Sequence, residues 1–423
     1  MELRCGQAWT VAALVVVALG VRVAWSAWTE PTPPLLSDPE YYHATALSLA
    51  HGDGYSVVFT DHGFRSDGDA TALWPPGYSA FLAPGFALFG DRLWAAWAMN
   101  ALAGALTVVP VYVIGRRLFS PAAGVASAAI AALLPSFVFW TPVLMSETLF
   151  TFLFGCAIAA VLYSFVNGIA RPHVVIAAGI LIGLAALVRG QALILIPLAA
   201  VWWLLDGNQS KQALTAAGAA AIIALGVLAP WAIRNTVVMD SPIVLSANFG
   251  YNLRIGHAPY STGRYILPQD LWDAEPGISL KEREVVFNDL GRRRALRYAL
   301  DHPQRELALA GRKIVWLWRS DSDALHWATT FGATPLPSRA WEPLRLLLDV
   351  TYLIVLALAG ATLLRIRERS RTLAFPLLLV AGWTLLHVIF FGEPRYHLPL
   401  LVVLVPMAAS TAVWAASRRI ITA

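Results

Sequence analysis

Cysteine and charged residues are both scarce in this chain, and each scarcity excludes a class of protein. The two cysteines, Cys5 and Cys156, fall in or beside predicted helices, so neither a disulfide framework nor a cysteine metal site is expected. Charged residues make up 13% of the chain, against ~25% in an ordinary soluble domain. No glycine-rich phosphate loop or strand–helix alternation is present, which argues against a nucleotide-binding Rossmann-like domain. The net charge of +5 is not accompanied by a basic stripe or a binding motif, so no nucleic-acid partner is expected.

Hydrophobic residues, in contrast, make up 58% of the chain and gather in long runs. A transmembrane helix takes ~20 consecutive apolar residues, and runs of about that length or slightly shorter are bounded by charged residues, Pro or Gly. The sequence therefore predicts an all-α polytopic membrane protein with about ten crossings. The first run lacks a cleavage pattern and is predicted to be retained. The predicted helices span 8–28, 93–114, 121–140, 147–166, 173–188, 191–205, 212–231, 343–364, 372–391 and 397–416.

Basic residues are concentrated in the short connections on one side of the predicted bundle. They include Arg116, Arg117, Arg171, Lys211 and several arginines between 365 and 371. Lys and Arg in short loops stay cytoplasmic, so these connections and, with an even number of crossings, both termini are expected in the cytoplasm. The longer connections then face the outer side of the membrane.

Two longer connections lie on this outer side. The first, 29–92, contains a predicted amphipathic helix at 41–50 and an apolar stretch at 79–89, which is too short to span and should lie along the interface. The second, 232–342, is expected to form a partly helical cap. Helical patterns in this cap run over 280–300 and 302–319. The whole chain is predicted to have three parts: an N-terminal transmembrane catalytic module with its outer loop (1–231), the cap (232–342) and C-terminal transmembrane helices (343–423).

Ionisable residues are placed by this topology at the outer ends of several separate crossings. Charged side chains at membrane depth are costly and are usually functional or paired. Their convergence on one level is harder to explain by chance than any single residue. They are Asp38 and Glu40 after the first helix, Glu147 at the start of the fourth, Arg189 between the fifth and sixth, Arg234 after the seventh, and Glu393, Arg395, Tyr396 and His397 at the last outer turn.

Each of these residues also has an ordinary structural explanation. Asp38, before Pro39, fits a turn or the N-cap of the next helix. Glu40 fits a residue that faces solvent or caps the same helix. Glu147 fits a helix N-terminal carboxylate, which the macrodipole stabilises by ~0.3–1 kcal/mol. The arginines fit side chains that extend to lipid headgroups, and Arg22 inside the first helix is explained most simply in that way.

The histidines and aspartates of the outer segments do not form a clear metal-binding pattern. The histidines lack the helical or short-loop spacing of a metal site, and the aspartates fit a solvated loop while leaving a divalent cation open. No metal site and no certain cofactor is therefore predicted. The residues concerned are His43, His51, His62, His397, Asp53, Asp61, Asp67 and Asp69.

Four different short motifs lie at the outer ends of predicted helices. They read Ser37-Asp38-Pro39-Glu40-Tyr41-Tyr42, Pro75-Pro76-Gly77-Tyr78, Ser146-Glu147-Thr148 and Glu393-Pro394-Arg395-Tyr396. In this order the motifs resemble the C-type (GT-C) membrane glycosyltransferases, and more narrowly the branch with the protein O-mannosyltransferases and the lipid A aminoarabinose transferases. The runs 230–235 and 248–253 are similar to the outer segment of many bacterial members. The resemblance covers most of the chain to about Tyr265 and again from about Leu373, and it implies a GT-C helix bundle with outer-face juxtamembrane helices in a bacterial plasma membrane.

The resemblance implies an inverting glycosyltransferase that moves a sugar from a polyprenyl-phosphate-linked donor to a hydroxyl acceptor (protein, lipid or glycan) at the outer face. A carboxylate can act as the base for the acceptor hydroxyl, typically worth ~10²–10⁴-fold in rate, and arginine can bind the leaving phosphate bidentately. Asp38 and Glu147 are therefore the predicted catalytic residues. The predicted phosphate ligands are Arg395, Arg234, Arg189 and Arg254, and the predicted substrate contacts are Glu40, Tyr41, Tyr78, Asn252, Glu393, Tyr396 and His397.

Two other functions remain open at the level of sequence: a transporter or flippase for lipid-linked saccharides, and a non-catalytic binder of them. Transporters tend to carry charges near the midplane and to have related halves. Here the charges lie at one face and no internal repeat is evident. Asp38 together with Glu147 favours an enzyme over a binder.

Overall fold

The computed structural model of the chain describes residues 5–34, 37–57, 68–273, 278–330, 338–365 and 370–422. His62, Asp61 and Asp67, discussed above, lie outside these residues. Regular structure in the described ranges is almost entirely helical. Two short antiparallel hairpins accompany the helices, one pairing β1 (Ser56–Val57) with β2 (Asp69–Ala70) and the other pairing β3 (Phe165–Val166) with β4 (Ile169–Ala170). The predicted all-α class is confirmed.

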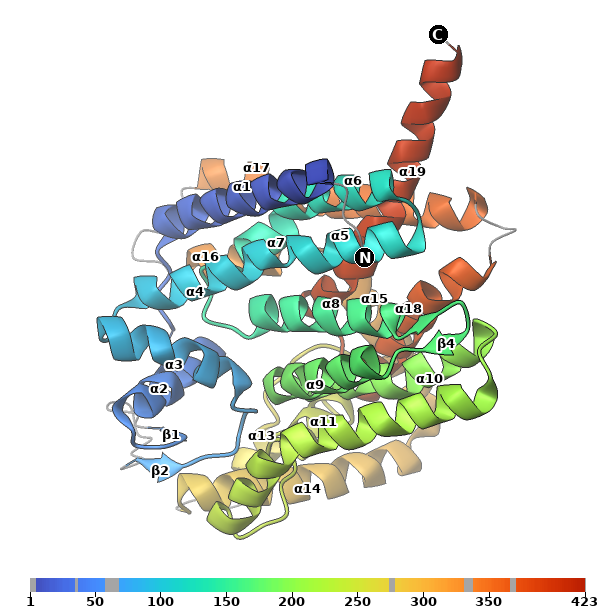
Figure 1. The fold of residues 1–423 in the computed structure, drawn as a ribbon. Helices are drawn as coiled ribbons and strands as arrows, with labels where there is room; N and C mark the ends of the chain where they lie inside the picture. The colour runs from blue at the N-terminus through green and yellow to red at the C-terminus, as the bar shows by residue number, and fades with distance from the viewer. Residues whose placement is uncertain are drawn as a thin grey trace.

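The hydrophobic runs form a bundle in which many of the long helices run side by side (Figure 1). Every predicted crossing coincides with a helix, in some cases one interrupted by a short break. Within the described ranges, 5 helices are long and apolar enough to cross a membrane, and shorter apolar helices accompany them. The chain is therefore an integral membrane protein, and the number of its crossings stays a prediction. The helices are α1 (Cys5–Thr29), α4 (Leu93–Leu106), α5 (Val108–Leu118), α6 (Pro121–Leu133), α7 (Pro135–Phe139), α8 (Glu147–Tyr163), α9 (Pro172–Val188), η1 (Gly190–Ile194), α10 (Leu195–Leu205), α11 (Ser210–Val238), α17 (Ser338–Arg365), α18 (Ser370–Ile389), η2 (Pro394–Leu400) and α19 (Leu401–Thr422).

Arg22 of α1 is fully buried inside the bundle. Its side chain was predicted to extend to the lipid headgroups, and it does not. Its guanidinium donates to the carbonyls of Ala132 (2.9 Å) and Ala131 (3.2 Å), in the last turn of α6. That helix ends where Leu134 precedes Pro135, because a residue before proline is pushed out of the α conformation. The last carbonyls of a helix lack partners within it and carry its partial negative charge. Arg22 therefore caps α6, and the headgroup interpretation is wrong.

We expect the Arg22→Met substitution to lower the midpoint of thermal unfolding. Two carbonyls inside the bundle would lose their donors, and a buried unsatisfied polar group costs ~1–3 kcal/mol. Thermal unfolding of the purified protein in detergent measures the effect. Arg92→Met is the control, because Arg92 is exposed just before α4. Equal midpoints for the wild type and both variants would contradict the capping role.

The first outer segment gathers at one end of the bundle as α2 (Asp38–His51), α3 (Gly77–Phe89) and the β1–β2 hairpin (Figure 1). Ser37 is the N-cap of α2 and accepts a hydrogen bond from the backbone N–H of Glu40 at 3.4 Å. The helix stops at Gly52, whose φ of 86° lies in the left-handed region that favours glycine. The helix expected at 41–50 is thus confirmed, and the stretch 79–89 is helical.

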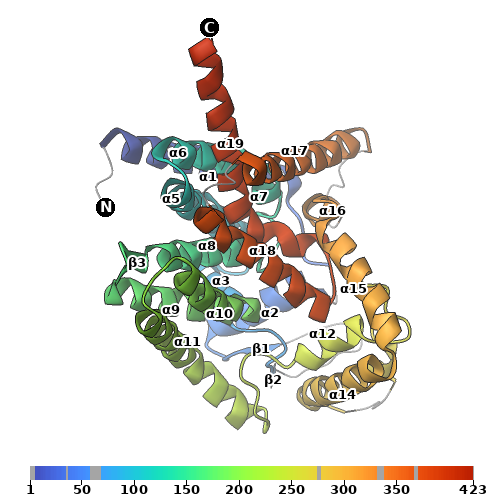
Figure 2. The ribbon, with the colours of Figure 1, turned by 90° about the vertical axis from the view of Figure 1, so that its right-hand side faces the viewer.

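The second outer segment is also largely helical. Its helices α14 (Leu280–Asp301), α15 (Pro303–Trp318) and α16 (Asp323–Thr330) follow one another along one side of the bundle (Figure 2). α14 begins with a capping box in which Ser279 and Glu282 bind each other's backbone N–H groups. One boundary differs from the prediction: α11 continues through Val238, so Arg234 lies inside this helix and not after it. Pro230 is accommodated within α11, as membrane helices often allow. The cap helices are α12 (Phe249–Gly256), α13 (Gln269–Trp272), α14 (Leu280–Asp301), α15 (Pro303–Trp318) and α16 (Asp323–Thr330), which confirms the helical patterns at 280–300 and 302–319.

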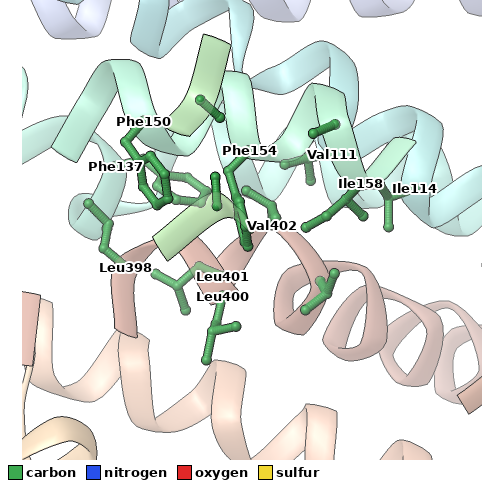
Figure 3. Packing of buried hydrophobic residues seen from close by; sticks show 14 of the residues in the cluster. Val111, Ile114, Phe137, Phe150, Phe154, Ile158, Leu398, Leu400, Leu401 and Val402 are labelled. Carbon is green, nitrogen blue, oxygen red and sulfur yellow. The ribbon is translucent and has the colours of Figure 1, made fainter. Parts of the chain in front are cut away.

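A hydrophobic core packs the start of α8 against the junction between η2 and α19 (Figure 3). Fully buried side chains of α8 belong to the same core as side chains of α5 and of the η2–α19 junction. Because this core is closely packed, it sets the position of Glu147 relative to the turn that carries Arg395. The core residues include Phe150, Phe154 and Ile158 of α8, Val111 and Ile114 of α5, and Leu398, Leu400, Leu401 and Val402 of the junction.

Candidate active site

Glu147 is the first residue of α8 and is almost completely buried. Its Oε1 accepts a hydrogen bond from Nη2 of Arg189 at 2.6 Å, and Nη1 of Arg395 lies 3.9 Å from the same oxygen. Its Oε2 is buried without a hydrogen-bond partner among the described residues. One carboxylate therefore faces two guanidinium groups and keeps a second oxygen unused.

Arg189 reaches Glu147 because the chain leaves helical geometry at this residue. α9 ends at Val188, and Arg189 has extended backbone angles (φ −148°, ψ 120°) before η1 begins. Its Nε donates to Oγ of Ser146 at 2.7 Å, which fixes the guanidinium from a second side. The predicted break between the fifth and sixth crossings is confirmed.

Arg395 joins the two carboxylates of the site. It is the second residue of η2, and its Nη1 donates to Oδ2 of Asp38 at 3.4 Å. Asp38 is the first residue of α2, so the N-cap role considered above belongs to Ser37. The side chain of Asp38 is 30% exposed, against 1% for Glu147. Asp38 is thus the more accessible of the two carboxylates. We call Asp38, Glu147, Arg189 and Arg395 together the charged cluster.

Burial raises the pKa of Asp38 above its usual value of 3.8, and the charge of Glu147 adds to the increase. The charges of Arg395 and Arg189 act in the opposite direction. A carboxylate whose pKa is raised binds a proton more readily, and this property suits a general base. The cluster carries two acidic and two basic side chains, so it has no surplus positive charge while Asp38 is ionised.

Tyrosine side chains surround the charged cluster. Tyr396 lies beside both arginines, with its ring centroid 5.2 Å from the guanidinium carbon of Arg395 and 5.8 Å from that of Arg189. Tyr42 donates to Oγ of Ser146 at 3.5 Å. Behind it lies Tyr78, which packs against the Tyr42 ring at 4.9 Å and is fully buried. Tyr396 is therefore brought to the cluster as predicted, whereas Tyr78 supports it from behind.

Two further tyrosines of the outer segment, Tyr251 and Tyr265, were missed by the prediction. Burial is the largest cause of the raised pKa of both hydroxyls, and the charge of Asp38 contributes to the same increase. Tyr251 lies in the run 248–253 already singled out in the sequence, but no sequence pattern showed which way its side chain points.

Glu393 lies next to the cluster and holds this tyrosine in place. Its Oε1 accepts a hydrogen bond from the backbone N–H of Tyr265 at 2.8 Å, and Nε of Arg264 lies 3.6 Å from the same atom. Burial raises the pKa of Glu393. Its polar contacts thus order the outer segment beside Asp38.

Two predicted phosphate ligands are not brought to the charged cluster. Arg234 donates to the carbonyls of Thr71 (2.6 Å) and Tyr55 (2.8 Å). Arg254 forms an ion pair with Asp270 at 3.1 Å. Both guanidinium groups are therefore engaged in holding outer segments together, and as phosphate ligands they stay predictions.

His397 is also directed away from the cluster. It is completely buried, with Nδ1 2.8 Å from the carbonyl of Leu317 and Nε2 3.1 Å from Oδ1 of Asp321. The Tyr352 ring stacks on it at 4.4 Å. These contacts give His397 a place in the packing of η2, and its role as a substrate contact stays a prediction.

The remaining predicted substrate contacts lie on two helices. Glu40 and Asn252 are partly buried on α2 and α12. The hydroxyl of Tyr41 contacts that of Thr71, away from the charged cluster. In the described part of the chain, no group of three or more His, Cys, Asp or Glu side chains could hold a metal ion. The binding of a divalent cation, which the sequence left open, is not tested by these residues.

The helix bundle, the helices α2 and α3 at one end of it, and the charged cluster where α2 meets the bundle define a class of protein. They are the features of the GT-C membrane glycosyltransferase fold, as the motifs predicted. Solved structures agree: the oligosaccharyltransferase AglB from Archaeoglobus fulgidus, in complex with an inhibitory peptide and a dolichol-phosphate, matches 96% of this chain with a TM-score of 0.57 at 17% identity. An oligosaccharyltransferase of Archaeoglobus fulgidus in complex with Zn and sulfate matches 96% of this chain with a TM-score of 0.57 at 13% identity. The chain spans about half the length of these structures, 50% of the first and 49% of the second.

A family model adds to the structural likeness. Residues 74–233 match the model described as dolichyl-phosphate-mannose-protein mannosyltransferase. ArnT from Cupriavidus metallidurans bound to undecaprenyl phosphate is similar at 16% identity and a TM-score of 0.46, over 98% of this chain and 79% of that one. A comparison with curated protein sequences gives no match. Residues 74–233 are thus similar to that family, and the chain has the GT-C membrane glycosyltransferase fold.

Proposed function

We propose that the chain is an inverting glycosyltransferase that moves a sugar from a polyprenyl-phosphate-linked donor to a hydroxyl acceptor at the outer face of the membrane. The observation that carries this proposal is the charged cluster, in which an accessible carboxylate and two arginines meet beside an apolar bundle. Two comparisons support a lipid-phosphate donor: the family model is named for dolichyl-phosphate-mannose enzymes, and the AglB structure holds a dolichol-phosphate.

Asp38 is the proposed general base. Of the two carboxylates in the cluster, it is the more exposed, and its contact with Arg395 at 3.4 Å is longer than the 2.6 Å bond between Glu147 and Arg189. A base must come within hydrogen-bond reach of the proton that it takes. Asp38 meets that requirement for an acceptor that arrives from outside, whereas Glu147 lies behind the two arginines.

Arg395 and Arg189 are the proposed ligands of the leaving phosphate. Both guanidinium groups lie against Glu147, and Arg395 also reaches Asp38. When Asp38 takes the acceptor proton it becomes neutral and its attraction for Arg395 weakens. The positive charge of Arg395 is then available for the phosphate on which negative charge develops.

The proposed reaction is a single displacement. The acceptor oxygen loses its proton to Asp38 and forms a bond to the anomeric carbon. The bond between that carbon and the phosphate oxygen breaks, and its electron pair leaves with the polyprenyl phosphate. Because the attack comes from the side opposite the leaving group, the anomeric configuration is inverted.

Glu147 is proposed to hold the two arginines at the distance that a phosphate needs. Removing one partner of a buried ion pair leaves the other charge uncompensated, which is strongly unfavourable. Its Oε2 is buried and has no hydrogen-bond partner among the described residues. Glu147 would therefore act on the phosphate through the two arginines.

The division of the chain into 1–231, 232–342 and 343–423 is also kept as a proposal. Asp38, Glu147 and Arg189 come from the first part, while Arg395 comes from the last. The N-terminal part therefore does not contain the whole charged cluster. We propose that the cluster faces the outside of a bacterial plasma membrane and that both termini are cytoplasmic.

The proposed base predicts the pH dependence of transfer. The pKa of Asp38 is raised, so the basic form is lost as the pH falls through a value above 3.8, and kcat/KM should fall with it. The charge of Glu147 raises this pKa, so Glu147→Gln should move the acid limb to lower pH in whatever activity remains. The pH profiles of kcat/KM for the two proteins provide the measurement. An acid limb at the same pH in both would contradict the assignment of Asp38.

The proposed function is tested with the purified protein in vesicles that contain a labelled polyprenyl-phosphate-linked sugar, beginning with mannose. A glycosyltransferase should move the label to an added hydroxyl acceptor and release polyprenyl phosphate. Label that crosses the bilayer without transfer would indicate a transporter, and label that is only retained would indicate a binder. The anomeric configuration of the product, determined by NMR, tests inversion separately.

A further inference from the structure

A buried polar network joins the cap to α2, the helix that carries Asp38. It begins at Glu284 on α14, whose side chain is only 3% exposed. Its Oε1 accepts a hydrogen bond from the hydroxyl of Thr71, and its Oε2 accepts one from the backbone N–H of Ala72 at 2.8 Å. The oxygen of the Thr71 hydroxyl contacts the hydroxyl of Tyr41 on α2. Since an ionised carboxylate only accepts, the donors run in one direction, from Tyr41 to Thr71 to Glu284.

The segment at Thr71 and Ala72 is held from other sides as well. Arg234 of α11 donates to the carbonyl of Thr71 at 2.6 Å. The carbonyl of Ala72 accepts a hydrogen bond from the backbone N–H of Ala247 at 2.7 Å. Three helices therefore meet at this short segment, and its polar atoms are engaged by residues far apart in the sequence. A segment fixed in this way can act as a rigid connection between the cap and α2.

The position of Tyr41 on α2 makes this connection relevant to Asp38. Residues three apart on a helix are neighbours on its surface, so fixing Tyr41 restricts rotation of the helix at Asp38. The next residue, Tyr42, reaches Ser146 beside the charged cluster at 3.5 Å. The first turn of α2 is thus attached on one side to the cap and on the other to the start of α8.

We propose that Glu284 is a positioning residue for the transfer reaction: through Thr71 and Tyr41 it fixes the rotation of α2 and so places Asp38 toward the acceptor hydroxyl. The inference rests on the proposed function. It also assigns the cap a task, because movement of α14 would be transmitted to the base.

The chemistry of the network requires a carboxylate at position 284. Two donors converge on its two oxygens, and an amide would turn one of those acceptors into a donor. Burial raises the pKa of Glu284 to about 7, whereas Thr71, Ala72 and Arg234 favour the ionised form. Kinetic measurements at a pH about one to two units higher therefore examine the carboxylate.

The test compares Glu284→Gln and Thr71→Val with two matched controls in the full-length protein. Thr71→Ser keeps the hydroxyl, and Asp289→Asn removes a carboxylate whose side chain is 40% exposed on the same helix. A misplacement of ~1 Å can cost ~10²-fold in rate, so Glu284→Gln and Thr71→Val should lower kcat by ~10–10²-fold. The KM for the donor should stay within about twofold, because the arginines are untouched. Both controls should resemble the wild type.

Backbone hydrogen exchange of α2 supplies a readout that does not need activity. Glu284→Gln and Thr71→Val should accelerate exchange at Ala72 and in α2, while α8 is unchanged. Unchanged exchange in α2 would overturn the inference, as would accelerated exchange with normal kcat. If Glu284→Gln does not fold, the pair Thr71→Val and Thr71→Ser decides. A wild-type protein without transferase activity counts against the proposed function, and the exchange data still decide whether α14 and α2 are coupled.

Discussion

Replacing Asp38 with asparagine is expected to lower the rate of sugar transfer by at least ~10²-fold, since general base catalysis typically contributes ~10²–10⁴-fold. Asparagine has nearly the same shape but cannot take a proton from the acceptor hydroxyl. Ser37 remains as the N-cap of α2, so the helix should persist. Single-turnover transfer from a labelled donor measures the chemical step, and equilibrium binding measures donor affinity, which should change little.

Asp53→Asn is the matched control for this experiment. Asp53 is an exposed aspartate just after α2, so its substitution changes the net charge equally without touching the charged cluster. Its transfer rate should equal that of the wild type. Rapid transfer by the Asp38→Asn protein would show that another group serves as the base.

Replacing Arg395 with alanine is expected to lower transfer by ~10²–10³-fold, the usual cost of removing one group that stabilises developing negative charge. Arg395 contacts both carboxylates of the cluster, and its loss leaves Arg189 as the only guanidinium there among the described residues. Donor affinity should fall as well, because the phosphate is already anionic in the ground state. Arg395→Lys should retain part of the activity, since lysine keeps the charge but not the planar pair of donors.

Two other arginines make the Arg395 experiment specific. Arg319→Ala removes an exposed arginine of the cap and should leave both transfer and donor affinity unchanged. Arg234→Ala should change kcat without a large loss of donor affinity, because Arg234 binds the carbonyls of Thr71 and Tyr55. If Arg234→Ala weakened donor binding as much as Arg395→Ala, the phosphate site would have to include Arg234.

The sequence predicted the helices well because the physical requirement behind them is local. A run of apolar residues must satisfy its own backbone within the membrane, and only a helix does so over such a length. The break at Arg189 was predicted for the same reason, since a charge divides two apolar runs. The end of α11 was not predicted, because Arg234 lies past the apolar run while the helix continues to Val238.

The candidate site could be predicted only to the level of the membrane at which its residues lie. Topology placed Asp38, Glu147 and Arg395 at one level, and the structure brings these three together. Topology placed Arg234 at that level too, although its side chain is engaged by backbone carbonyls. Which way a side chain points depends on helix rotation and on neighbours distant in sequence, and one sequence does not contain that information. Glu284 carries no motif and was missed for the same reason.

The contact between Arg22 and the end of α6 has a consequence for biosynthesis. The carbonyls that receive the guanidinium belong to residues 131 and 132, which follow Arg22 by 109 and 110 residues. A ribosome therefore releases α1 long before its partner exists. During that interval the first helix is a span with an uncompensated charge, and an isolated charge inside a bilayer is costly. We therefore expect α1 to stay at the translocon or near the lipid surface until α6 emerges, so that these two helices insert as a pair.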